Sequence, residues 1–295
     1  MDIADLKVFE AVARLGSMNR AAVELHTVQS NVTARIRSLE REVGVPLFQR
    51  HVHGVSMTPA GQRMLPYAAR MAKLLADAKM AAVDDGPPSG NLNLGTLETT
   101  AAIRLAPVLG TFTRMYPRVR LSLATGTTSG LTRDVIECRL DGAFVAGPLD
   151  YPDLFTEAVF REELVLVSSC AIRSLDALST VPDLKPIVFR LGCSYRQRLE
   201  ALLADMGIFV SAPLEFGSID AIVTCVAAGV GVTLLPRSVV SANANHNQLS
   251  VHTLPGGRGI VETLFIRRRD SYVSSAMQSF IDVARSELGV RMAAA

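Results

Sequence analysis

The sequence predicts a mainly α N-terminal head, a long connecting helix and a two-lobed α/β body. Two short capped helices with a tight turn between them, followed directly by two short strands, predict the head. Strand-like and helix-like segments that alternate beyond Gly90 predict the body. A chain of 295 residues is long enough to bury a separate core in each part.

The helix pair begins at Ser17, a good N-cap residue, and its first helix ends near His26. Thr27 is expected to cap the second helix. Apolar residues then recur at helical spacing: Val28, Val32, Ile36, Leu39 and Val43. Because the turn between the two helices is so short, the pattern indicates a helix-turn-helix.

The second helix carries small, hydrogen-bonding and cationic residues on the face opposite its apolar side. They are Ser30, Thr33, Ala34, Arg37 and Arg41, with Gln29 and Asn31 near the N-terminal end. Such side chains suit a helix that lies in the major groove of DNA. The alternative is an ordinary amphipathic helix pair with a solvated polar face, and the flanking segments decide against it.

An amphipathic helix with Leu6, Phe9 and Val12 on its apolar side precedes the pair and completes a three-helix core. After Gly44, residues 47–50 and 55–58 read as two short strands with a tip at residues 51–54. The whole is a winged helix-turn-helix. We expect Arg50 and the tip, with His53, to meet DNA phosphates or the minor groove.

Charge and composition agree with a DNA-binding protein of the cytoplasm. Residues 1–83 hold 11 Lys and Arg against 7 Asp and Glu, a net charge of +4, whereas residues 87–295 hold 19 of each. The four cysteines have no C-x-x-C spacing, which argues against a zinc site and a disulfide framework. Neither a signal peptide nor a membrane-spanning segment is expected, so the predicted location is cytoplasmic.

Thr58 and Pro59 open a long helix rich in Ala, Met and Leu that extends to about Val83. At 1.5 Å per residue its length is roughly 37 Å, which overhangs a head of this size. Its apolar stripe either packs on its own domain or, as we expect, pairs with the same helix of a second subunit. The segment 84–90 then reads as a hinge.

Beyond Gly90, strands alternate with helices, which predicts parallel sheets covered by helices in two lobes. The helices are expected at residues 100–115, 128–139, 195–206, 219–228 and 273–288. The expected domains are a winged helix-turn-helix at 1–58, a linker and dimerisation helix with hinge at 59–89, and a ligand-binding body at 90–295. Within the body, lobe I is expected at 90–161 and 265–295, and lobe II at 162–264. The chain is expected to cross between lobes near 159–163 and 259–265.

A ligand is expected between the lobes, because helix N-termini at the carboxyl ends of parallel strands offer free N–H groups. Hydroxyl groups gather at several of these strand ends, although any single one is also an ordinary helix cap. With arginine on one wall, they indicate a small carboxylate or other anion. Glu98 leaves room for an amine on the same ligand.

The head resembles the N-terminal domain of LysR-type transcriptional regulators. The resemblance rests on the motifs L-x-x-F-x-x-V-A-x-x-G-S, A-A-x-x-L, Q-S-N-V-T-x-x-I-x-x-L-E, G-x-x-L-F-x-R and T-P-A-G, in this order over residues 6–61. Two positions depart from the family pattern, since Ser30 stands where proline is common and Ala34 where arginine is frequent, with Arg35 beside it. The resemblance implies DNA contacts from Gln29, Ser30, Asn31, Thr33, Ala34, Arg35, Arg37, Arg50 and His53.

The body resembles the effector-binding domain of the same family, which is similar to periplasmic binding proteins. The motifs are L-x-L-G at 92–95, F-x-x-x-Y-P-x-V at 112–119, G-C-S-Y-R at 192–196 and G-V-G-V-T-L-L-P at 229–236. The residues expected to contact the effector are Thr99, Thr100, Thr127, Thr128, Cys193, Ser194, Arg196 and Ser218. The resemblance implies a homodimer or homotetramer on double-stranded promoter or operator DNA, with RNA polymerase as a further partner.

Other function classes find less support. Cys193 lies before a helix with Arg190 and Arg196 nearby, conditions that lower a thiol pKa, so a redox-responsive regulator is the alternative. A two-lobed α/β enzyme is a weaker rival, because no catalytic motif occurs and only His246 and His252 lie beyond residue 90. A solute-binding transport protein is a further alternative, but it would need a signal peptide and would not need a winged helix-turn-helix. No catalytic residue, cofactor or metal is expected.

Overall fold

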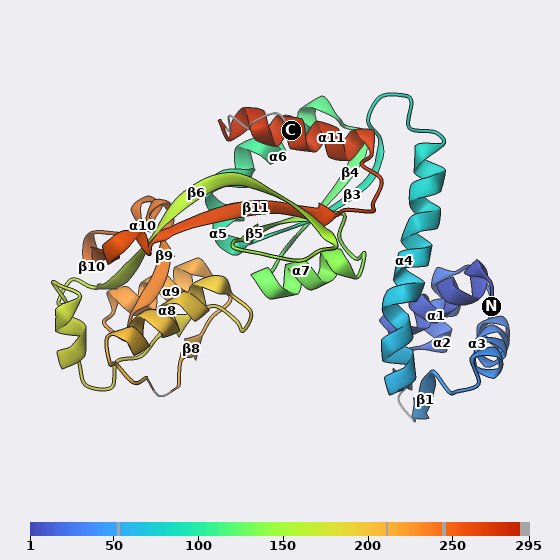
Figure 1. The fold of residues 1–295 in the computed structure, drawn as a ribbon, viewed down its shortest axis with the longest axis horizontal. Helices are drawn as coiled ribbons and strands as arrows, with labels where there is room; N and C mark the ends of the chain where they lie inside the picture. Colours follow the sequence, from blue (N-terminus) through green and yellow to red (C-terminus); the bar gives the residue numbers. More distant parts are fainter. Residues whose placement is uncertain (52–53, 211, 244–245, 290–295) are drawn as a thin grey trace. The chain divides into compact units, whose positions relative to one another are not determined.

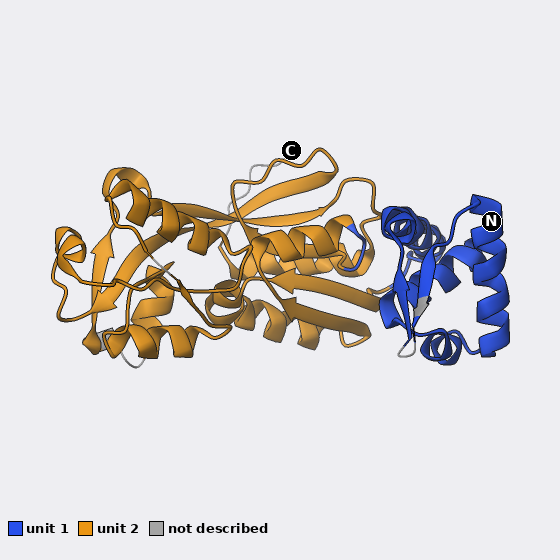
Figure 2. Cartoon of the chain, turned by 90° about the horizontal axis from the view of Figure 1, so that it is seen from below, with its two compact units in different colours: residues 1–86, 137–139 blue, residues 87–136, 140–295 orange. Residues whose placement is uncertain are grey.

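The computed structural model describes residues 1–51, 54–210, 212–243 and 246–289, and the chain divides into two compact units. Unit 1 comprises residues 1–86 with 137–139, and unit 2 comprises residues 87–136 and 140–295 (Figure 2). Unit 1 holds the head and the long helix, and unit 2 holds the α/β body (Figure 1).

Three helices form the head: α1 (Ile3–Leu15), α2 (Met18–Glu24) and α3 (Gln29–Val43). Asp2 and Asp5 make a capping box at the start of α1, and the Ser17 hydroxyl accepts from the backbone N–H of Arg20 at the start of α2. The predicted apolar faces of the three helices meet in one core. Its members include Leu6, Phe9, Val12, Ala21, Val32, Ile36 and Leu39.

The ends of α3 differ from the prediction. The N-cap is Val28 without a side-chain hydrogen bond, and the Thr27 hydroxyl instead accepts from the Asn31 amide at 2.9 Å. Val28 and Val43 are 65% and 41% exposed, so the apolar pattern extended one turn too far at each end. Spacing alone does not show where the neighbouring helices stop covering a helix face. The central positions Val32, Ile36 and Leu39 are buried as predicted.

The wing consists of β1 (Phe48–His51) and β2 (Gly54–Met57), paired antiparallel with Phe48 opposite Met57. The predicted tip residues 52–53 lie outside the described residues. The long helix α4 (Pro59–Ala81) follows, with Pro59 in its first turn as predicted. The Thr58 hydroxyl caps α4 by accepting from Gly61 N–H, and it donates to the carbonyl of Pro46.

Unit 2 contains a mixed sheet rather than the purely parallel sheets that were predicted. Its strands are β3 (Gly90–Thr96), β4 (Val119–Thr125), β5 (Gly142–Ala146), β6 (Leu154–Ser169), β9 (Thr233–Pro236), β10 (Leu249–Thr253) and β11 (Ile260–Arg268). The order is β10-β6-β11-β5-β3-β4, and β9 also pairs with β6. Within this sheet, as described, β3 pairs in parallel with β4 and β5, and the other pairs are antiparallel, because β6 and β11 carry the chain out and back in opposite directions.

The first lobe is built on β3, β4 and β5. Its helices are α5 (Glu98–Thr100), the π-helical turn η1 (Ala101–Leu105), α6 (Ala106–Met115), α7 (Thr128–Ile136) and α11 (Ser275–Glu287). The sequence predicted one regular helix from Thr100 to Met115, and the π-helical turn interrupts it. Pro107 lies in the first turn of α6 and has no backbone N–H to donate to the carbonyl one turn earlier. The missing hydrogen bond is a physical reason for the wider, π-helical turn at this place.

The second lobe has a small parallel pair, β7 (Ile187–Val188) and β8 (Leu214–Glu215). Its helices are α8 (Ser194–Asp205), α9 (Ile219–Ala227) and α10 (Arg237–Ala242), with short 3-10 turns at Asp176–Thr180, His246–Gln248 and Pro255–Gly257. The predicted helices at 195–206 and 219–228 are confirmed. The sequence analysis did not identify α10, β10 or the first half of β6.

Two long strands connect the lobes of unit 2. β6 and β11 lie side by side and run from the lobe with α6, α7 and α11 to the lobe with α8, α9 and α10 (Figure 1). Their antiparallel pairing extends from Leu154 opposite Arg268 to Glu163 opposite Ile260, with one register shift between Thr263 and Leu264. The two crossings predicted from sequence are therefore one continuous two-stranded ribbon.

The described residues contain neither a candidate membrane span nor a candidate metal site. No helix there combines the length and the apolar composition that a membrane span requires. Within the same residues, no group of three or more His, Cys, Asp and Glu side chains is arranged to hold a metal ion.

Candidate functional site

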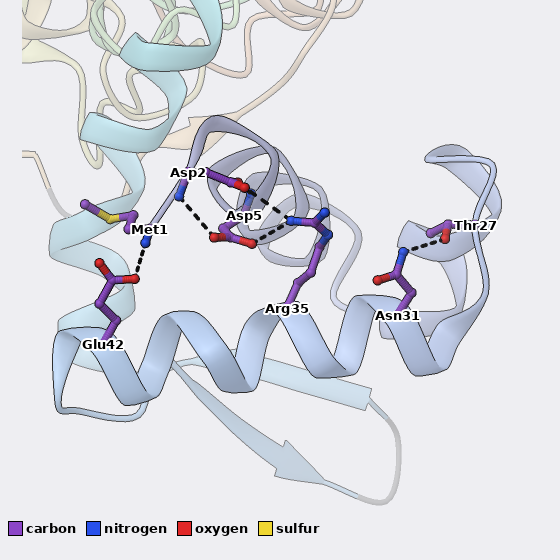
Figure 3. A network of polar contacts seen from close by, with 7 residues as sticks. All are labelled: Met1, Asp2, Asp5, Thr27, Asn31, Arg35 and Glu42. Carbon is purple, nitrogen blue, oxygen red and sulfur yellow. Dashed lines mark hydrogen bonds and ion pairs between the residues drawn. The ribbon is translucent and has the colours of Figure 1, made fainter.

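The recognition helix α3 divides its polar residues between two faces. One face points toward the N-terminal segment and the turn before α3, where Asn31, Arg35 and Glu42 have partners (Figure 3). Glu42 pairs with the terminal amine of Met1. The other face carries residues with an accessible side chain: Gln29, Ser30, Thr33, Ala34 and Arg37. Gln29 donates to the Thr33 hydroxyl at 2.9 Å, which holds these two side chains together.

Arg35 fastens α3 to α1 instead of extending outward. Its guanidinium lies 2.8 Å from the Asp5 carboxylate and 3.7 Å from that of Asp2 (Figure 3). Asp5 is the better covered of the two partners, with 14% of its side chain exposed. An arginine held in this way orients the recognition helix, so its position does not support the predicted contact of Arg35 with DNA. Asn31, bonded to Thr27, is occupied in the same manner.

The wing residues that were expected to contact DNA are described only in part. His53 lies outside the described residues, and so does the side chain of Arg50. The imidazole Nε2 of His51 lies 2.6 Å from the Ser56 hydroxyl across the strand pair. Val55 N–H donates to the carbonyl of Gly16, which anchors the wing to the end of α1.

Helix α4 has one apolar stripe that its own head does not cover. Met64 and Leu65 pack against the head core, so Leu65 belongs to the fold of the head. Tyr67, Met71 and Leu74 are 67%, 45% and 65% exposed. Their spacing of four and three residues places them on one face of the helix. This exposed stripe is the feature of α4 that is available to a second subunit.

A cavity of about 240 Å³ lies within unit 2, between the ends of the first-lobe strands and the start of α8. It is lined by Leu97, Glu98, Thr99, Thr125, Gly126, Thr127, Thr128, Ala146, Phe189, Arg190, Cys193, Ser194, Tyr195, Phe216 and Gly217. Five of the eight residues expected to contact an effector are in this set. Thr100, Arg196 and Ser218 are not.

Hydroxyl groups at the cavity differ in what they already bond. Thr127 accepts from Gly130 N–H and so caps α7, and Thr128 accepts from Ala146 N–H at 3.4 Å. The Thr99 and Tyr195 hydroxyls are fully covered and lie next to each other, and neither makes a hydrogen bond of normal geometry within the described residues. Burial raises the pKa of Tyr195, so its hydroxyl keeps its proton. A buried hydroxyl without a partner is costly unless a water or ligand atom satisfies it.

The arginine of the cavity is Arg190, whereas Arg196 has a different role. Arg196 pairs with Glu200 at 2.9 Å and Glu215 at 3.0 Å on the flank of α8, where both carboxylates neutralise it. Arg190 has no ion pair in the described part of the chain. Its guanidinium lies against Gly217, where an added Cβ would be 3.5 Å from Nη2. The prediction that Arg196 contacts an effector is therefore not supported by its position.

Cys193 lies in the cavity wall, but its predicted acidity is wrong. Burial raises the pKa of its thiol, which outweighs hydrogen bonds from the backbone of Arg196 and Tyr195 and the charge of Arg196. All four cysteines are free thiols. A buried, protonated thiol reacts slowly with oxidants, so the structure gives no support to the redox alternative.

Both parts of the chain match models of one protein family. The model for the bacterial regulatory helix-turn-helix protein, lysR family, matches residues 3–62, and that for the LysR substrate binding domain matches residues 85–289. This chain belongs to the LysR family of transcriptional regulators. The order of the two matched models, with the helix-turn-helix first and the substrate-binding domain second, agrees with the head and the two-lobed body. LysR regulators bind DNA and form oligomers.

Curated LysR relatives are similar over almost the entire chain. The transcriptional regulator GltR of Bacillus subtilis is 38% identical over 291 residues, which cover 99% of this chain and 98% of the relative. YofA of Bacillus velezensis is 42% identical over 282 residues, covering 96% and 97%.

Solved LysR structures share the fold. A full-length OxyR variant from Pseudomonas aeruginosa has a TM-score of 0.75 at 20% identity and covers 97% of this chain and 95% of its own. Full-length CbnR in complex with its target DNA has a TM-score of 0.64 at 22% identity and covers 97% and 100%.

The LysR body contains a link between the cavity and the second lobe that the sequence did not reveal. Thr99 lies in α5, and the π-helical turn η1 follows directly. From this turn, Ile103 packs against the second-lobe core, and Nε of Arg104 lies 3.5 Å from the buried Glu162 carboxylate on β6. Burial raises the pKa of Glu162, and the charge of Arg104 partly opposes this shift.

Tyr195 and Phe189 are also cavity residues that the sequence analysis missed. Both lie beside predicted positions, in the segment 189–196, but neither was among the residues expected to contact an effector. Only the approach of the two lobes shows that they form the cavity wall.

Proposed function

We propose that this LysR regulator binds operator DNA in the cytoplasm through the exposed face of α3, and that a small carboxylate in the unit 2 cavity modulates its activity. The observation that carries the proposal is the chemistry of this cavity. Thr99 and Tyr195 present two adjacent buried hydroxyls that make no hydrogen bond of normal geometry with the described residues, and Arg190 presents a guanidinium without an ion pair in the same part of the chain. Hydroxyl donors and an arginine together satisfy a carboxylate, whose oxygens accept several hydrogen bonds.

Effector binding is proposed to alter the geometry between the lobes. The cavity takes residues from both lobes, and the turn that follows Thr99 contacts the second lobe through Ile103 and Arg104. A ligand that bridges Thr99 and Ser194 binds one interlobe angle better than another. That difference in affinity is what shifts an equilibrium between two states.

On DNA, the protein is proposed to act as a dimer joined through the stripe Tyr67, Met71 and Leu74 of α4. A two-fold dimer presents two recognition helices to the two halves of a pseudo-palindromic operator. Gln29, Ser30, Thr33, Ala34 and Arg37 are the proposed base-reading residues. Arg50 and His53 remain proposed contacts of the wing.

Replacing Thr33 or Arg37 by alanine is expected to weaken specific binding by about 1–3 kcal/mol each, because each removes a proposed contact to a base edge. Fluorescence anisotropy of the full-length protein on an operator selected from random DNA measures the loss. Ser38→Ala is the matched control, since Ser38 is exposed on the flank of the same helix. If both variants bind like the parent at physiological salt, α3 does not read the operator through this face.

The effector site is tested by a pair of neighbouring threonines. Thr99 and Thr100 are equally buried and both hydroxyls lack a partner, but only Thr99 lines the cavity. For a carboxylate found by thermal-shift screening of the full chain, Thr99→Val should weaken binding about tenfold or more, through one lost charge-assisted hydrogen bond. Thr100→Val should leave the affinity unchanged.

Without ligand, Thr100→Val should be at least as stable as the parent, because it removes a buried hydroxyl that has no partner in the described structure. Thr99→Val should be within about 1 kcal/mol of the parent, because the hydroxyl it removes lies beside that of Tyr195 without a bond of normal geometry. Calorimetric titration measures affinity, and thermal unfolding measures stability. Equal affinities of Thr99→Val and the parent, or the absence of any binding carboxylate, would contradict the proposed site.

A further inference from the structure

A second cavity, of about 510 Å³, lies beside the first on the outer side of the α8 N-terminus. Thr128, Ala146 and Ser194 line both cavities, so the two adjoin at these residues. We name them the inner and the outer cavity. The outer cavity also takes residues from both lobes: Ser129, Gly147, Pro148, Leu149, Asp150 and Tyr151 from the first, and Gly192, Gln197, Arg198 and Ala201 from the second.

Each cavity holds one arginine without a counter-ion in the described part of the chain. Arg198 is half-buried in the outer cavity, and its Nη2 donates to the Gly147 carbonyl at 3.1 Å. This bond fixes the guanidinium across the lobe boundary and leaves its other N–H groups unused within the described structure. Arg190 is the corresponding residue of the inner cavity. Arg196, on the same helix as Arg198, lines neither cavity and is neutralised by Glu200 and Glu215.

The unpaired arginines differ from Arg196 in a way that bears on ligand charge. An arginine with an acidic partner contributes little new attraction for an anion, whereas an unpaired one keeps its donors for it. Glu98 in the inner cavity and Asp150 in the outer one are the acidic residues that compete. Neither forms an ion pair with the local arginine in the described structure. Asp150 and Arg190 are both exposed, so solvent weakens the effect of each of these charges.

We infer that the effector carries two anionic groups, one for each cavity, and is therefore a small dicarboxylate. Arg190 with the Thr99 and Tyr195 hydroxyls takes one carboxylate, and Arg198 takes the other. The chain between them passes Thr128, Ala146 and Ser194. This inference rests on the proposed function, because it names the class of ligand for the same cleft.

The test is calorimetric titration of the full-length protein with dicarboxylates of increasing length, from succinate through glutarate and adipate to pimelate. Each is compared with the monocarboxylate of equal chain length, from butyrate to heptanoate. At least one dicarboxylate should bind about tenfold or more tightly than its monocarboxylate, since a charge-assisted hydrogen bond contributes about that factor.

Three arginine variants separate the inference from the proposed function. Arg198→Ala should remove the advantage of the dicarboxylate and leave the monocarboxylate affinity unchanged. Arg190→Ala should weaken both ligands. Arg196→Ala is the matched control on α8, and it should preserve the ratio between the two ligands.

The outcomes are distinguishable. If no carboxylate of either kind binds, the proposed function fails. If monocarboxylates bind equally well, or the advantage survives in Arg198→Ala, the inner site stands and the dicarboxylate inference is overturned. Tighter binding of an amine-bearing analogue, such as γ-aminobutyrate instead of succinate, would also overturn it and assign the outer cavity to Asp150.

Discussion

Replacing Leu74 by glutamate is expected to produce a folded monomer that has lost most of its operator affinity. Leu74 lies with Tyr67 and Met71 on the exposed stripe of α4. In a two-fold helix pair each copy would bury an unpaired carboxylate, and one such charge costs about 3–5 kcal/mol. The dimer dissociation constant should therefore rise at least about a hundredfold, as measured by analytical ultracentrifugation.

The matched control is Ala76→Glu, which adds the same charge to an exposed position on the opposite side of α4. It should remain a dimer with parental operator affinity. The folding of Leu74→Glu is checked by circular dichroism, since Leu74 is outside the head core. A dimer of unchanged stability in Leu74→Glu would show that the subunits associate through another surface.

Replacing Gly61 by alanine is expected to disrupt the winged head and abolish DNA binding. Gly61 lies in the first turn of α4, where an added Cβ would be 2.3 Å from the Leu47 carbonyl oxygen. That carbonyl accepts from Thr58 N–H, so it cannot move without loss of a hydrogen bond at the wing. Overpacking against backbone costs about 1–3 kcal/mol or more, a large share of the stability of a small domain.

The comparison variant is Gly86→Ala, because an added Cβ at Gly86 meets no atom within 4 Å. Thermal unfolding and operator binding should be those of the parent in Gly86→Ala and strongly reduced in Gly61→Ala. Binding of the carboxylate ligand should persist in both, since unit 2 has its own cores. Normal operator affinity of Gly61→Ala would show that α4 and the wing can move apart without loss of stability or DNA binding.

Local sequence rules predicted the head well, because its helices are short, capped and amphipathic. Ser17 and Thr58 cap the helices they were expected to cap, and Val32, Ile36 and Leu39 are buried. Arg35 could not be assigned in the same way. Its partner Asp5 lies 30 positions away, and spacing within one helix does not show which neighbour will neutralise a cation.

The body was harder to predict because its pairing is non-local. Helices α8 and α9 were identified from their own residues, but the first half of β6 mixes polar and apolar positions and shows its nature only opposite β11. The cavity was anticipated from hydroxyls at strand ends, and Thr99, Thr127, Thr128, Cys193 and Ser194 do line it. Arg190 and Arg196 are six positions apart, and their different environments depend on Gly217, Glu200 and Glu215.

The ribbon of β6 and β11 limits how the two lobes can move. Because the strands stay hydrogen-bonded through the crossing, the lobes cannot swing apart about two independent loops. Paired strands are twisted along their length, and the register shift between Thr263 and Leu264 interrupts the regular pairing and increases the local twist. A ligand that draws the cavity walls together would then rotate one lobe relative to the other about the ribbon.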